Sequence, residues 1–123
     1  MNVNFCAKLK IDDSVYKKLK FSNAKEIVEE TQKVLDIPQI SRLITEDELA
    51  ISAKRYGKGD CVQIQYGDDL IEIANSNGKV THQSVIHQIL LVTCFKHGKN
   101  PRCSLPKYVF ETLAKITKEK FGN

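Results

Sequence analysis

A long apolar segment near the end of this 123-residue chain constrains its fold more than any other feature. Between residues 81 and 97, apolar side chains recur so often that they cover nearly the whole circumference of an α-helix. They are Val85, Ile86, Ile89, Leu90, Leu91, Val92 and Phe95. Because such a helix must be buried, we expect residues 81–97 to form the central, most buried element of the fold. Its longest uninterrupted apolar run, residues 89–92, is far too short to cross a bilayer.

Three other segments have the pattern of β-strands. Residues 3–11 alternate between apolar and polar side chains, which is the period of a half-buried strand. Residues 61–66 and 70–74 are predicted to form a hairpin around Gly67-Asp68-Asp69. With the preceding tyrosine, this turn resembles the Tyr-Gly-Asp-Asp turn of viral RNA polymerases, in which paired carboxylates hold magnesium. Two-metal chemistry needs a further carboxylate on a neighbouring strand, and the predicted strands contain no such aspartate, so we interpret the motif as an ordinary turn.

Helices are predicted over residues 13–20, 24–35, 45–56, 81–97 and 104–121. The second begins at Asn23, an N-cap residue followed three positions later by Glu26, and it ends before Pro38. Thr45 and Glu48 repeat this capping pattern for the third helix. The expected fold is a single α+β domain spanning the whole chain, in which the N-terminal strand and the central hairpin form a small antiparallel sheet. Four to five helices are expected to cover one face of that sheet.

The order of the second helix, the third helix and the hairpin resembles that of a winged helix. That resemblance implies that the second helix of the pair would enter the major groove of DNA. Its first residues would be Thr45-Glu46-Asp47-Glu48, whose carboxylates would repel the phosphates. We therefore interpret these acidic residues as partners of the helix dipole rather than as DNA contacts.

The cysteines are expected to be free thiols. The chain begins without an apolar run long enough for a secretory signal, which predicts a cytoplasmic location, where disulfide frameworks are rare. Cys94, His97 and Cys103 form a candidate set of zinc ligands, joined by His87 seven residues before Cys94. Their spacing matches no standard zinc finger, and Cys94 has the apolar neighbours of a core side chain. We expect no cofactor, with zinc on these four residues as the alternative.

Positive charge is concentrated in the last third of the chain. The formal net charge is +4, and residues 79–123 carry eight basic and two acidic groups. A basic loop in this region joins the last two predicted helices. Its candidate ligand-binding residues are Lys96, His97, Lys99, Arg102, Lys107 and Tyr108. Their cations would bind an anion beside the free N–H groups that open the last helix.

Three classes of function remain open. The first is a non-catalytic module whose basic C-terminal third binds a polyanion, with nucleic-acid phosphates as the expected ligand. The second is an inhibitor or adaptor, of a regulatory or phage-accessory type, that docks on an acidic protein. The third is a small enzyme, acting on a phosphate ester or depending on His82, His87, His97 or a thiol. We assign no catalytic residues, because no motif brings two of these groups together. Self-association through a sheet edge also stays open.

Overall fold

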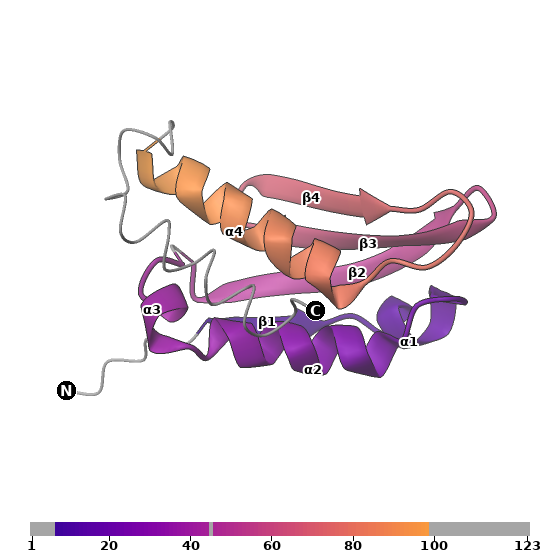
Figure 1. Cartoon of the computed structure of the whole chain (residues 1–123), viewed down its shortest axis with the longest axis horizontal. Helices are drawn as coiled ribbons and strands as arrows, with labels where there is room; N and C mark the ends of the chain where they lie inside the picture. Colours follow the sequence, from indigo (N-terminus) through magenta and orange to yellow (C-terminus); the bar gives the residue numbers. More distant parts are fainter. Residues whose placement is uncertain (1–6, 45, 99–123) are drawn as a thin grey trace.

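The computed structural model describes residues 7–44 and 46–98 of the chain. In chain order its elements are β1 (Lys8–Ile11), α1 (Ser14–Lys18), α2 (Ala24–Leu35), α3 (Pro38–Ser41), β2 (Glu48–Tyr56), β3 (Gly59–Tyr66), β4 (Asp69–Ala74) and α4 (His82–Gly98). Figure 1 shows two layers, a sheet and the long helices α2 and α4 lying across it. The expected α+β class is confirmed.

The four strands form one mixed sheet in the order β1-β2-β3-β4. β2, β3 and β4 are antiparallel neighbours, whereas β1 runs parallel to β2, with Leu9 opposite Leu49. The prediction of an antiparallel sheet is therefore wrong for its first strand. A parallel neighbour requires a long crossover connection, and α1, α2 and α3 supply it here.

Residues 48–56 form a strand, and the helix predicted over residues 45–56 is wrong. Leu49, Ile51 and Ala53 are buried while the residues between them are more exposed, which is the two-residue period of a strand. Glutamate, alanine, lysine and arginine favour helices, but this segment lies between β1 and β3, which pair with its backbone on both sides. Glu48 begins β2, so the helix cap predicted there is wrong. The resemblance to a winged helix fails for the same reason.

Three of the five predicted helices are confirmed as α1, α2 and α4. The Asn23 side chain caps α2 by accepting the Glu26 N–H at 3.1 Å. Pro38 lies beyond the end of α2, as predicted, and occupies the first turn of α3, a short helix that was not predicted. The expectation of four to five helices is not matched as stated. One predicted helix is a strand, and the last, over residues 104–121, lies outside the described residues.

The hairpin predicted around Gly67 is confirmed. β3 and β4 pair as far as Tyr66 and Asp69, which leaves Gly67 and Asp68 as the turn. Gly67 has a φ of +60°, a conformation that residues with a side chain seldom adopt. Asp68 is exposed, whereas Asp69 forms an ion pair of 2.8 Å with Lys96 of α4.

The core lies between the sheet and the two long helices, and β3 is at its centre. Val62, Ile64 and Tyr66 of β3 are fully buried, and Cys61 is 1% exposed. The prediction that helix 81–97 is the most buried element is therefore wrong. One side of α4 is buried, by Val85, Ile86, Ile89, Leu90, Thr93 and Cys94. Its other apolar side chains lie nearer the surface.

Candidate functional site

The predicted basic loop begins at the end of α4. The Lys96 ammonium lies 2.8 Å from the Asp69 carboxylate and 4.9 Å from the centre of the Tyr66 ring, and the bond to Asp69 raises the pKa of Lys96. Lys96 thus fastens α4 to the β3–β4 turn. His97 belongs to α4, but its side chain is not among those described. Lys99, Arg102, Lys107 and Tyr108 lie outside the described residues, so anion binding there stays a prediction.

The structure does not gather the candidate zinc ligands that it describes. Cys94 is buried where α2 meets α4, and burial raises the pKa of its thiol, while His87 is exposed. Cys103 and the His97 side chain are not described. Within residues 7–44 and 46–98, no three histidine, cysteine, aspartate or glutamate side chains are grouped to hold a metal ion. Cys94 therefore has the surroundings of a core residue.

The side chains considered for catalysis are also dispersed. His82 Nδ1 lies 2.8 Å from Glu26 Oε1, and this contact joins the starts of α4 and α2. The thiols of Cys61 and Cys94 are buried, and burial raises the pKa of each. A raised pKa disfavours the thiolate that a cysteine nucleophile requires. The His82–Glu26 contact links two helices, and neither buried thiol has the lowered pKa of a nucleophile.

A buried carboxylate organises the other end of the molecule. Asp60, near the start of β3, is fully buried. Its Oδ1 accepts the Lys20 N–H at 2.9 Å. Its Oδ2 accepts the N–H groups of Phe21 at 2.8 Å and Ser22 at 2.7 Å. Burial alone would raise the pKa of Asp60, but these hydrogen bonds outweigh it and lower the pKa. Asp60 is therefore an ionised anchor for the loop between α1 and α2.

The backbone of Asp60 also fixes the connection between β4 and α4. Its N–H donates to the Gly78 carbonyl, and its carbonyl accepts the Asn75 N–H, both at 3.0 Å. The Ser22 hydroxyl then accepts the Val80 N–H at 2.7 Å. Residues 19–22, 56–60 and 75–80 are thus held together. Figure 1 shows the three connections at one end of the molecule, with α1 and the β2–β3 turn on the right.

Glycines allow these segments to approach closely. A Cβ atom on Gly59 would lie 1.7 Å from the Asn75 carbonyl oxygen, so any side chain there would displace the β4–α4 connection. Gly57, in the β2–β3 turn, has a φ of +59°. The sequence Tyr56-Gly57-Lys58-Gly59 therefore makes a tight turn that packs directly against the β4–α4 connection.

Exposed lysines and aromatic rings project from these three segments. Lys20, Lys58 and Lys79 are exposed, and none of the three forms an ion pair with a described residue. Five other lysines do form ion pairs, namely Lys17, Lys25, Lys33, Lys54 and Lys96. Phe21 is 55% exposed and Tyr56 is 52% exposed. We call Lys20, Phe21, Tyr56, Lys58 and Lys79 the cationic end.

A hollow of about 500 Å³ adjoins the cationic end and is lined by Tyr56 and Lys79. Polar groups supply much of the remaining lining, from Asn75, Ser76, Thr81 and Ser84. Thr81 caps α4, its Oγ1 accepting the Ser84 N–H at 3.2 Å. The start of a helix carries partial positive charge, which adds to that of Lys79. The hollow therefore suits a negatively charged group beside an aromatic ring.

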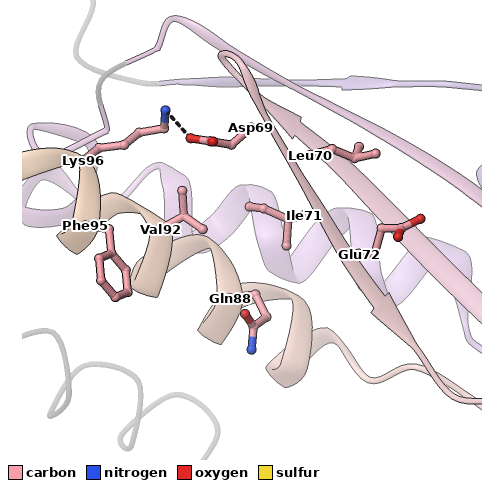
Figure 2. Close-up of a pocket in the computed structure, with 8 residues that line it drawn as sticks. All are labelled: Asp69, Leu70, Ile71, Glu72, Gln88, Val92, Phe95 and Lys96. Carbon is pink, nitrogen blue, oxygen red and sulfur yellow. Dashed lines mark ion pairs between the residues drawn. The ribbon is translucent and has the colours of Figure 1, made fainter. Parts of the chain in front are cut away.

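A second hollow, of about 610 Å³, lies between β4 and α4. Figure 2 shows Val92 and Ile71 directed into this groove from the two elements, with the Lys96–Asp69 ion pair at one end. Leu70 and Phe95 also line it, and both are more than half exposed. The groove is thus more apolar than the hollow beside the cationic end.

Comparison of the chain with protein-family models, curated proteins and solved structures finds no match. Among the helices that the structure describes, none combines the length and the apolar character needed to span a membrane. The sequence analysis missed the cationic end, because its parts lie almost 60 residues apart and meet only around Asp60. The one local signal is a lysine within two residues of an aromatic residue, in Lys20-Phe21 and in Tyr56-Gly57-Lys58.

Proposed function

We propose that this protein is a non-catalytic module that binds single-stranded nucleic acid through the cationic end. One observation carries the proposal: three exposed lysines without ion pairs in the described structure and two half-exposed aromatic residues lie on three connections that are hydrogen-bonded to one another around Asp60. Lysines that neutralise phosphates supply most of the affinity of such modules, and aromatic rings stack on unpaired bases. Neither group alone distinguishes a nucleic acid from another polyanion, whereas the two together do.

The geometry favours a single strand over a duplex. Duplex bases are stacked on one another, so half-exposed rings such as Phe21 and Tyr56 can stack only on bases that are unpaired. The segment that a winged helix would place in the major groove is strand β2 in this protein. Sequence-specific reading of bases is therefore not part of the proposal.

The anchored backbone supports the same role. The loop carrying Lys20 and Phe21 is fixed by three hydrogen bonds to one buried carboxylate, and the loop carrying Lys79 is fixed to the backbone of the same residue. A surface that is ordered before its ligand arrives loses less conformational entropy on binding. The loops of the cationic end are thus already ordered in the free protein, and binding an extended ligand would not have to order them.

Binding of a fluorescent oligothymidine and a fluorescent oligouridine tests the proposal. The triple variant Lys20→Gln, Lys58→Gln, Lys79→Gln is expected to bind at least about tenfold more weakly than the native chain. Lys17→Gln, Lys25→Gln, Lys33→Gln is the matched control, because it removes the same charge from lysines that are already in ion pairs. Equal losses in the two variants, or no binding by the native chain, would refute the proposal.

The two aromatic rings allow a second test, which is independent of the lysine substitutions. Replacing Phe21 and Tyr56 by leucine keeps apolar side chains but removes the stacking surface. Affinity for the oligonucleotides is expected to fall roughly tenfold, while affinity for heparin, a polyanion without bases, stays the same. Equal losses for both ligands would reduce the proposal to general polyanion binding. A protein captured from nuclease-treated lysate by the native chain, and lost with the triple lysine variant, would instead favour an acidic protein partner.

The predicted contacts Lys99, Arg102, Lys107 and Tyr108 form a separate hypothesis. α4 runs away from the cationic end, and its last turn lies beside the β3–β4 turn (Figure 1). Lys99→Gln, Arg102→Gln, Lys107→Gln therefore tests them apart from the cationic end. A loss of oligonucleotide affinity confined to that variant would move the site to the basic loop predicted from the sequence.

A further inference from the structure

The two edges of the sheet are protected differently. On the outer side of β1, the Gln32 side chain of α2 takes the place of a neighbouring strand. Its Oε1 accepts the Leu9 N–H at 3.1 Å, and its Nε2 donates to the Ala7 carbonyl at 3.2 Å. Beyond the end of β1, the Ser14 hydroxyl accepts the Ala53 N–H of β2 at 2.9 Å. Part of this edge is therefore covered against another strand.

The opposite edge, formed by β4, has no such protection in the described structure. The Asn75 N–H points at the Asp60 carbonyl of β3, and the direction of backbone groups alternates along a strand. The N–H and C=O groups of Leu70 and Glu72 consequently face away from β3. No described side chain or strand pairs with this outer side of β4. Within residues 7–44 and 46–98, the outward backbone groups of Leu70 and Glu72 thus have no partner.

We propose that the β4 edge pairs with β4 of a second copy of this chain, in an antiparallel arrangement about a two-fold axis. The groove between β4 and α4 runs beside this edge, with Leu70 and Phe95 more than half exposed. Pairing would join two four-stranded sheets into one of eight strands. The apolar side chains that line each groove would then be covered by the other copy.

Side-chain alternation and charge select one register for this pairing. Opposed residues must point to the same side of the joined sheet, so the two-fold axis passes through a residue of β4, and Ile71 and Glu72 are the residues at the middle of the strand. An axis at Glu72 would place two carboxylates directly opposite one another, which is unfavourable. An axis at Ile71 places Leu70 opposite Glu72 of the other copy, and these are the residues whose backbone groups face outward. The Ile71-centred register therefore satisfies both the hydrogen bonds and the charges.

The partly covered β1 edge favours an assembly of two copies. If both edges were free, edge pairing could continue and build an open fibre. Gln32 and Ser14 occupy part of the β1 side, so among the described residues the β4 edge is the more open of the two. A second copy suits this surface better than an extended peptide, because the symmetric pairing uses the same outward groups twice and leaves no carboxylates opposed.

Sedimentation of the full chain, from micromolar to submillimolar concentration, tests the proposal. A monomer–dimer equilibrium is expected, with no larger species. Leu70→Lys and Phe95→Lys, both at exposed positions, are each expected to weaken the dimer by roughly 100-fold, because each change occurs twice in the interface. Tyr16→Lys is the matched control, since Tyr16 is 56% exposed on α1, far from β4, and it should leave the dimer unchanged.

Amide hydrogen exchange locates the interface independently of those variants. The N–H groups of Leu70 and Glu72 should exchange slowly at high protein concentration and rapidly on dilution. A native chain that stays monomeric, or a dimer that persists in Leu70→Lys, would overturn the proposal. If Leu70→Lys fails to fold, rapid exchange at both amides in the native dimer would overturn it equally.

Discussion

A single carboxylate, that of Asp60, connects segments of the chain that are far apart in sequence. It accepts three backbone N–H groups at distances of 2.7 to 2.9 Å, and such charge-assisted hydrogen bonds are stronger than those between neutral groups. The loop that it holds carries Lys20 and Phe21, two members of the cationic end. Loss of the Asp60 hydrogen bonds should therefore both destabilise the fold and disturb the loop that carries part of the cationic end.

Asp60→Asn tests this anchor directly. The variant replaces one accepting oxygen by an NH₂ group, which would face N–H donors in a buried site. We expect the free energy of unfolding to fall by about 2 to 4 kcal/mol. Urea denaturation measures the change. Asp68→Asn, in the exposed β3–β4 turn, is the control and should change stability by less than about 0.5 kcal/mol. Equal effects of the two substitutions would show that Asp60 is not an anchor.

The lowered pKa of Asp60 also predicts a pH dependence. A carboxyl group whose pKa is lower in the folded state adds stability above its unfolded pKa and loses that contribution as the pH falls through the folded value. The difference in unfolding free energy between the native chain and Asp60→Asn should therefore be constant at neutral pH and shrink below about pH 4. Urea titrations between pH 7 and the acid transition measure it. A difference that grew with acidity would contradict the assigned sign.

At the scale of elements, the sequence predicts best those segments whose periodicity agrees with their composition. α2 has a capped start at Asn23 and an apolar face, and α4 has a long apolar run, so both were expected. β2 was not, because residues 48–56 combine strand periodicity with helix-forming residue types. The parallel pairing of β1 with β2 was missed for the same reason. Because residues 48–56 were expected to be helical, no strand was available to pair with β1 after the intervening helices. Contacts between distant segments, such as those of Asp60, leave no periodic signal at all.

The Gln32 side chain of α2 protects the edge of the sheet at β1, and a single substitution removes this protection. Gln32→Ala leaves the helix intact but exposes the outer N–H and carbonyl groups of β1. We expect a loss of about 1 to 2 kcal/mol in unfolding free energy and faster exchange of the Leu9 amide. Lys33→Ala, at the next and exposed position of α2, is the control. Unchanged exchange at Leu9 would show that Gln32 does not close this edge.

Across the whole molecule, the two ends of the sheet differ in how their charges are used. At the β3–β4 turn, Lys96 pairs with Asp69, and the buried Tyr66 hydroxyl bonds Thr93 Oγ1 at 3.0 Å, so polar groups there hold α4 in place. At the other end, the lysines of the cationic end have no ion pairs among the described residues, and the carboxylate of Asp60 is buried and bonded to backbone N–H groups. The proposed binding function rests on this difference between the two ends.

The salt dependence of oligonucleotide binding tests that distinction most directly. The logarithm of the dissociation constant should rise linearly with the logarithm of salt concentration, because each phosphate that is neutralised releases counterions. For the variant Lys20→Gln, Lys58→Gln, Lys79→Gln, we expect the slope to be smaller by about 2 than for the native chain, as the loss of three single-strand phosphate contacts requires. Parallel lines for the two proteins would show that these lysines do not contact the phosphates and would contradict the account.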